Sequence, residues 1–105
     1  MNNQINVTGW KTVSTLYNNV ITVYSNGIDC NVVFNGNVTY TQNNETTLAT
    51  IPSPYRPRNI ISGLPHGRVN TYKFAINNSG NILVQSFSGS GSTTISSYAS
   101  IYYSI

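Results

Sequence analysis

Few side chains in this sequence could perform chemistry. The chain has one histidine (His66), one cysteine (Cys30) and two carboxylates (Asp29 and Glu45). General acid–base catalysis needs two carboxylates, or a carboxylate and a histidine, within reach of one reacting group. Asp29 falls in a predicted strand and Glu45 in a polar loop distant along the chain, so their convergence would be accidental. Cys30 is predicted to be a small, buried apolar side chain. We therefore predict that the protein is not an enzyme.

The same scarcity argues against a bound metal or cofactor. One histidine, one cysteine and two carboxylates do not make a convincing transition-metal site. No glycine-rich phosphate loop opens a helix, because the sequence predicts no helix. A single cysteine cannot form an internal disulfide, so nothing indicates an oxidising compartment. We expect no cofactor and no metal.

The composition narrows the possible partners. Only 7% of residues are charged and the formal net charge is +3, whereas asparagine, serine, threonine and eight tyrosines supply most of the polarity. Proteins that bind nucleic acid usually spread many lysines and arginines over one face, so no nucleic-acid partner is expected. No apolar run approaches the roughly 18 residues of a membrane span, and we expect no membrane insertion. So little charge suits a protein embedded in a larger assembly.

Carbohydrate binding is the function that these residue types support. Sugar hydroxyls need planar hydrogen-bonding groups, and the C–H faces of the ring stack on aromatic side chains. A basic cluster near one predicted hairpin could hold a phosphate or an acidic sugar. The candidate saccharide-binding residues are His66, Arg68, Tyr72, Lys73, Gln85 and Trp10. Alternatives remain open: the basic residues could be a solvated sheet edge, a tyrosine could sit at the core edge, and Trp10 could fasten the N-terminus or a subunit seam.

The first half of the chain reads as antiparallel strands. β-Branched and aromatic residues dominate, and no segment keeps helical spacing. Strands are expected over 10–16, 20–24 and 28–34, with a tight turn at Asn26-Gly27 and the even positions of 28–34 facing the core. Asn35-Gly36 repeats the turn signal and leads into a strand over 37–41. The pattern predicts a three-stranded meander joined by two Asn-Gly turns.

The second half centres on a proline-rich stretch within 47–82. A strand over 48–51 stops at three closely spaced prolines (Pro52, Pro54 and Pro57), because each lacks a backbone N–H. Extended structure follows over 59–64, and then a hairpin over 72–87 with a turn at 77–80. A last strand over 95–105 is expected to pair in the sheet. Eight or nine short strands favour a barrel or a sandwich, and we expect an all-β, Greek-key-like small antiparallel β-barrel.

The length is that of one domain. We expect residues 1–9 to be a linker or an artificial start, and 10–105 to form a single β-barrel head domain.

Two motifs resemble a known family. The sequence LATIP at 48–52, followed by YRPRN at 55–59, resembles a "P-x-x-Y/F-R/C-P" stop that recurs in phage tail-fibre and baseplate domains. The sequence YKFAINNSGNI at 72–82 is similar to their following hairpin. The chain resembles the C-terminal head domain of receptor-binding proteins of lactococcal siphophages. That resemblance implies a homotrimeric head at the tail tip of the virion, made in the host cytoplasm, which contacts other baseplate or tail proteins and binds a bacterial cell-wall saccharide.

The chain departs from that family where the sugar is held. Lys73 and Ala75 stand where the family carries a histidine and an aspartate, and Val84 and Gln85 stand where it carries a tryptophan. Serines occupy the position of an expected C-terminal arginine. The resemblance therefore implies the fold, whereas the ligand or the site must differ. The alternatives are a structural or adaptor domain of a baseplate or tail fibre without a sugar site, and a cellular lectin-like module.

Overall fold

The computed structural model describes residues 9–63 and 71–105, and in these residues it contains no α-helix. The expected all-β class is confirmed. One short 3-10 helix, η2 (Ser53–Tyr55), lies in the proline-rich stretch. The strands are β1 (Lys11–Leu16), β2 (Ile21–Ser25), β3 (Asp29–Thr41), β4 (Glu45–Thr50), β5 (Ile61–Gly63), β6 (Tyr72–Ile76), β7 (Asn81–Ser86) and β8 (Ser92–Ser104).

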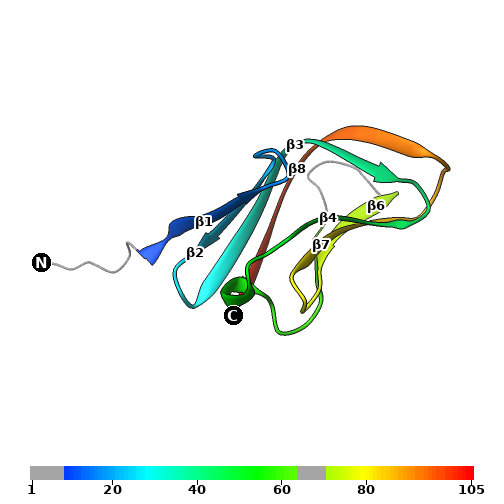
Figure 1. Ribbon diagram of the computed structural model, residues 1–105. Helices are drawn as coiled ribbons and strands as arrows, with labels where there is room; N and C mark the ends of the chain where they lie inside the picture. Colours follow the sequence, from blue (N-terminus) through cyan, green and yellow to red (C-terminus); the bar gives the residue numbers. More distant parts are fainter. Residues whose placement is uncertain (1–8, 64–70) are drawn as a thin grey trace, which may run out of the picture.

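These strands form two four-stranded antiparallel sheets that face each other (Figure 1). Sheet A has the strand order β1-β2-β3-β8, and sheet B has the order β4-β7-β6-β5. The closed barrel that the sequence led us to expect is not found in the described residues, which form a sandwich. The edge strands β5 and β8 meet through packing instead of hydrogen bonds: a Cβ at Gly63 of β5 would lie 2.6 Å from Ile101 Cγ1 of β8. The Ile101 side chain therefore packs closely against the backbone at Gly63.

The longest element is the ribbon of β3 and β8, which are 13 residues each and pair from Asp29 with Ser104 to Thr41 with Ser92. Strand β2 pairs only with the first part of β3, up to Phe34. The rest of the ribbon therefore continues beyond β1 and β2 and reaches sheet B (Figure 1). Tyr40 of β3 packs there against Tyr72 of β6, with ring centroids 5.3 Å apart.

The prediction of a tight turn at Asn35-Gly36 is wrong, because both residues lie inside β3. Gly36 has φ of +145°, and a Cβ there would lie 3.1 Å from Val20 Cγ2. Glycine is needed at this position by the backbone conformation and by the close approach of Val20, and it does not mark a reversal of the chain. Burial alternates without a break from Phe34 to Val38 across the glycine. One long strand thus replaces two strands of the predicted meander.

The core lies between the sheets and is centred on Phe34 of β3 and Phe74 of β6. Their rings stack with centroids 4.1 Å apart and an interplanar angle of 13°. The even positions 30, 32 and 34 of β3 face the core as predicted, whereas Ile28 precedes β3 and is 69% exposed. Cys30 is fully buried, as expected. Other buried members of the core include Ile21, Val23, Val32, Val38, Ile51, Ile76, Ile82, Val84, Ala99, Ile101 and Tyr103.

The proline-rich stretch is fastened to the turn between β6 and β7. The predicted turn at 77–80 is confirmed, with the Gly80 N–H donating to the Asn77 carbonyl at 2.9 Å. The Ile51 N–H donates to the Gly80 carbonyl at 2.8 Å, and Arg56 Nε donates to the Ile51 carbonyl at 3.0 Å. These bonds fix the direction in which the chain leaves β4, and so position residues 57–59 beside the end of β8.

Candidate functional site

Two of the six predicted site residues lie together on the outer face of sheet B. Lys73 of β6 and Gln85 of β7 are direct cross-strand partners. Gln85 Nε2 donates to Glu45 Oε2 at 2.9 Å, and Lys73 Nζ lies 6.0 Å from the centroid of the Phe87 ring. This outer face therefore carries a cation, an amide, a carboxylate and an exposed aromatic ring.

The other predicted residues do not join this pair. Tyr72 is 4% exposed and points into the core, on the opposite face of β6 from Lys73, where its hydroxyl lies 3.4 Å from Ser97 Oγ. Trp10 precedes β1 of sheet A and packs against Tyr102 of β8. The remaining two predicted site residues, His66 and Arg68, lie outside the described residues.

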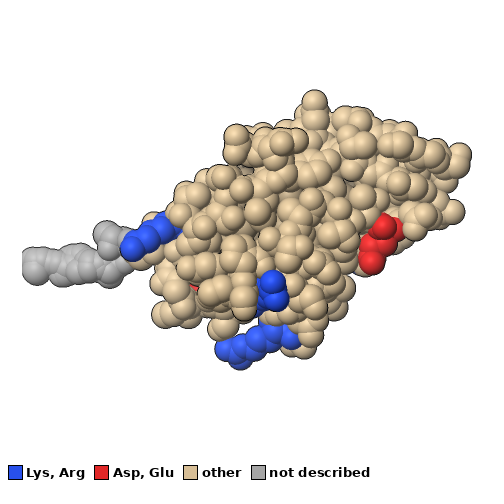
Figure 2. All heavy atoms as spheres, viewed as in Figure 1, with Lys and Arg blue, Asp and Glu red and all other residues tan. Residues whose placement is uncertain are grey.

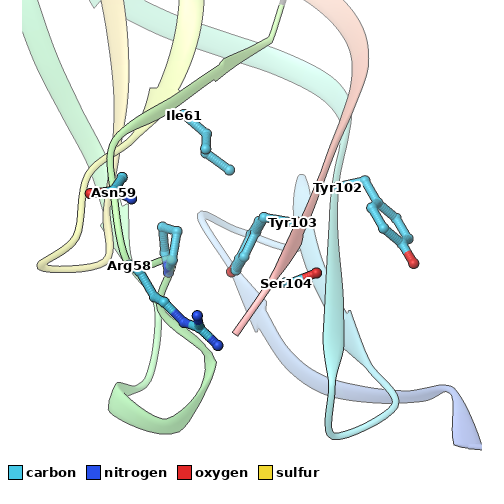
Figure 3. Close-up of a pocket in the computed structure, with 7 residues that line it drawn as sticks. Arg58, Asn59, Ile61, Tyr102, Tyr103 and Ser104 are labelled. Carbon is cyan, nitrogen blue, oxygen red and sulfur yellow. The ribbon is translucent and has the colours of Figure 1, made fainter.

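A pocket of about 340 Å³ opens at the edge of the sandwich where β5 and β8 diverge. One wall is made of residues 57–59 and Ile61, and the other of residues 102–104 at the end of β8 (Figure 3). In the close-up, the Ile61 side chain and the Tyr103 ring lie in the space between the two walls, whereas the Tyr102 ring points away across β8. This edge pocket combines an apolar floor with polar groups at its rim.

Arg58 and Asn59 supply the polar rim on one side. Both residues are exposed, and Arg58 Nη2 donates to the Ile105 main-chain oxygen at 3.0 Å. One guanidinium N–H group is thus engaged, and the others remain as donors for a ligand because arginine has five of them. The Asn59 amide adds both a donor and an acceptor.

Beside the opposite wall, the hydroxyl groups of Tyr102 and Ser104 converge on the carboxylate of Asp29, which does not itself line the pocket. Ser104 Oγ donates to Asp29 Oδ1 at 2.7 Å, and the Tyr102 hydroxyl donates to Asp29 Oδ2 at 2.8 Å. The hydrogen bond to Asp29 raises the pKa of Tyr102, because the carboxylate favours the protonated phenol. Each carboxylate oxygen can still accept another hydrogen bond.

The Tyr103 side chain forms the floor of the edge pocket, and its hydroxyl is engaged in a hydrogen bond. The Tyr103 hydroxyl donates to the Tyr55 carbonyl. Cys30 Sγ lies 3.7 Å from the same carbonyl oxygen. Burial raises the pKa of Tyr103 well above that of a free phenol. A neutral phenol committed to a main-chain acceptor is neither a general base nor a nucleophile.

Charged groups are few on the visible surface as a whole (Figure 2), although Arg58 and Asp29 lie at or beside the edge pocket. In the view of Figure 2 most of the molecule is uncharged, with a few basic groups and fewer acidic ones. Such a surface favours a ligand recognised by neutral hydrogen bonds and by ring stacking. Arg58 was not among the residues that the sequence pointed to. Its proximity to residues 102–104 depends on how the two sheets pack, and no sequence pattern reports that.

In the residues that the structure describes, no three His, Cys, Asp or Glu side chains are grouped so that they could hold a metal ion. Nor do these residues include a helix long and apolar enough to cross a membrane. No protein-family model matches the chain, and no curated protein matches its sequence.

Proposed function

We propose that this chain is a non-catalytic receptor-binding head domain of a phage tail tip, which binds a bacterial cell-wall saccharide in the edge pocket. The observation that carries the proposal is that Arg58 and Asn59 on one wall of the pocket face Ser104 on the other, with Ser104 bound to Asp29. The donors of Arg58 and the mixed donor and acceptor groups of Asn59 and Ser104 match sugar hydroxyls, which both donate and accept. The motifs at 48–59 and 72–82 supply the phage assignment.

The proposal includes a homotrimer, whose several weak sites would together bind a polysaccharide more tightly than one. A shallow pocket of this size binds one or two sugar residues weakly, because few contacts are made to offset the lost freedom of the ligand. A homotrimer at the tail tip presents several pockets to a repetitive polysaccharide and strengthens attachment without any new contact. Light scattering coupled to size exclusion should return a trimeric mass. A monomeric mass at micromolar concentration would contradict the proposed homotrimer.

Isothermal titration with a panel of purified Gram-positive cell-wall polysaccharides tests the binding function. Arg58→Ala should weaken binding about 10- to 100-fold, since a hydrogen bond to a charged group contributes roughly 1.5–3 kcal/mol. Lys73→Ala is the matched comparison, because it removes the same charge from the outer face of sheet B. If the wild-type protein and Arg58→Ala both give heat of binding but Lys73→Ala does not, the binding site lies on the outer face of sheet B and not in the edge pocket. No heat with any polysaccharide would contradict the binding function.

A structural or adaptor domain is the second candidate, favoured by apolar side chains on the surface. Ile28, Ile60 and Phe87 are 69%, 56% and 56% exposed. Exposed apolar groups of this kind often mark contacts with a partner. Under this alternative, Ile60→Asp abolishes incorporation into virions, while Arg58→Ala particles adsorb to cells normally. Adsorption counts with the two variants separate the candidates.

A further inference from the structure

An aromatic pair continues the edge pocket onto the outer face of sheet A. Trp10 and Tyr102 lie with ring centroids 6.0 Å apart and planes tilted by 47°. Both rings remain open to solvent, at 42% and 61% exposure. Neither ring is needed to close the core, which is built by the opposite faces of the strands.

The pair is joined to the edge pocket by a series of hydrogen bonds through Asp29. Tyr102 belongs to the pocket wall, its hydroxyl is bound to Asp29 Oδ2, and Ser104 of the same wall is bound to Asp29 Oδ1. The bond to Asp29 holds the Tyr102 ring in place, so little side-chain freedom is lost when a ligand stacks on it. Asp29 lies at the junction, where it can accept a hydrogen bond from a ligand that spans both places.

From this continuity we infer a second sugar subsite, formed by Trp10 and Tyr102, which makes the ligand an oligosaccharide that runs from the edge pocket across β8. The inference rests on the proposed saccharide-binding function. One sugar ring occupies the edge pocket, and a ring further along the chain places its C–H face on the aromatic pair. Aromatic faces attract the apolar side of a pyranose ring, whereas Asp29 and Ser104 face its hydroxyl groups.

The chain carries its own reporter of this subsite, because Trp10 is its single tryptophan. The test uses short and long fragments of whichever polysaccharide binds: a disaccharide, and fragments of four or more sugars. Calorimetry measures binding of each fragment, and tryptophan fluorescence measures contact at the aromatic pair. The long fragment should bind and change the Trp10 emission, whereas the disaccharide should bind and leave the emission unchanged.

Two variants test the edge pocket and the aromatic subsite separately. Trp10→Ala should weaken the long fragment about three- to tenfold and leave the disaccharide unaffected. Tyr98→Ala is the control, since it removes another exposed tyrosine from the outward face of β8 and should change neither affinity. Equal affinity of both fragments for the wild-type protein, or equal losses of both in Trp10→Ala, would overturn the second subsite alone. Absence of binding by every fragment would overturn the proposed function and this inference with it.

Discussion

Alanine at Gly80 should destabilise the domain much more than alanine at Gly91. The two glycines share a left-handed backbone, with φ of +83° and +79°. A Cβ at Gly80 would lie 2.8 Å from the Ile51 carbonyl oxygen and 2.7 Å from Arg56 Nε, whereas a Cβ at Gly91 would meet nothing within 4 Å. The comparison therefore separates backbone strain, which both variants carry, from steric conflict, which only one carries.

The structure sets the expected magnitudes. Left-handed backbone costs a non-glycine residue about 1–2 kcal/mol, and the smaller entropy of the unfolded alanine chain offsets about 0.4–1 kcal/mol. Gly91→Ala should therefore lower the free energy of unfolding by about 1 kcal/mol. Gly80→Ala adds an overpacking cost of about 1–3 kcal/mol, because Ile51 is held at the end of β4 and its carbonyl cannot retreat. The total loss for Gly80→Ala is about 3 kcal/mol.

Urea denaturation measures the difference between the two variants. With a slope of about 1.5 kcal/mol per molar urea, the midpoint of Gly80→Ala should lie roughly 1.3 M below that of Gly91→Ala. The slopes should be unchanged, because the same surface is exposed on unfolding. Equal midpoints would refute the reasoning, since they would show that the proline-rich stretch does not press against the turn at 77–80.

Three further outcomes follow from the core and its tyrosines. Phe34→Ala should lower the free energy of unfolding, measured by urea denaturation, by about 3–5 kcal/mol. Val33→Ala on the outer face of the same strand should lower it by about 1 kcal/mol or less. Similar losses in the two variants would contradict the sandwich core. Burial raises the pKa of Tyr103 above the unfolded value of about 10, so the unfolded state loses this proton first and stability should fall as the pH rises above about 10. In Tyr103→Phe that alkaline slope should be shallower by one proton, about 1.4 kcal/mol per pH unit, and an unchanged slope would exclude Tyr103 as its source. The buried Cys30 thiol should react with an aromatic disulfide reagent only in denaturant, and rapid labelling of the native protein would show that the core opens.

The hairpin of β6 and β7 could be predicted because its local signals agree. Phe74 and Ile76 alternate with less apolar positions, and the turn has asparagine first and Gly80 last. Gly36 shows where such signals fail. Asparagine followed by glycine permits a tight turn, but it also permits a strand position under a crowding side chain. Only the unbroken alternation of apolar and polar residues on both sides of the pair distinguishes a continuous strand from a tight turn, and this signal is weak.

The candidate site was harder to predict than the strands. Lys73 and Gln85 come together because they are paired in one hairpin, which local pattern reveals. Arg58 and Ser104 come together through the packing of two sheet edges. That contact depends on the whole topology, including the choice between barrel and sandwich, which strand periodicity does not settle.

Amide chemical-shift mapping tests the central claim most directly. The ¹⁵N-labelled protein is titrated with the cell-wall polysaccharide fragment that calorimetry identifies. The edge-pocket account predicts that the largest shifts fall on Arg58, Asn59 and Ser104, with Lys73 and Gln85 unmoved. Shifts confined to Lys73 and Gln85, or no shifts at all, would contradict it.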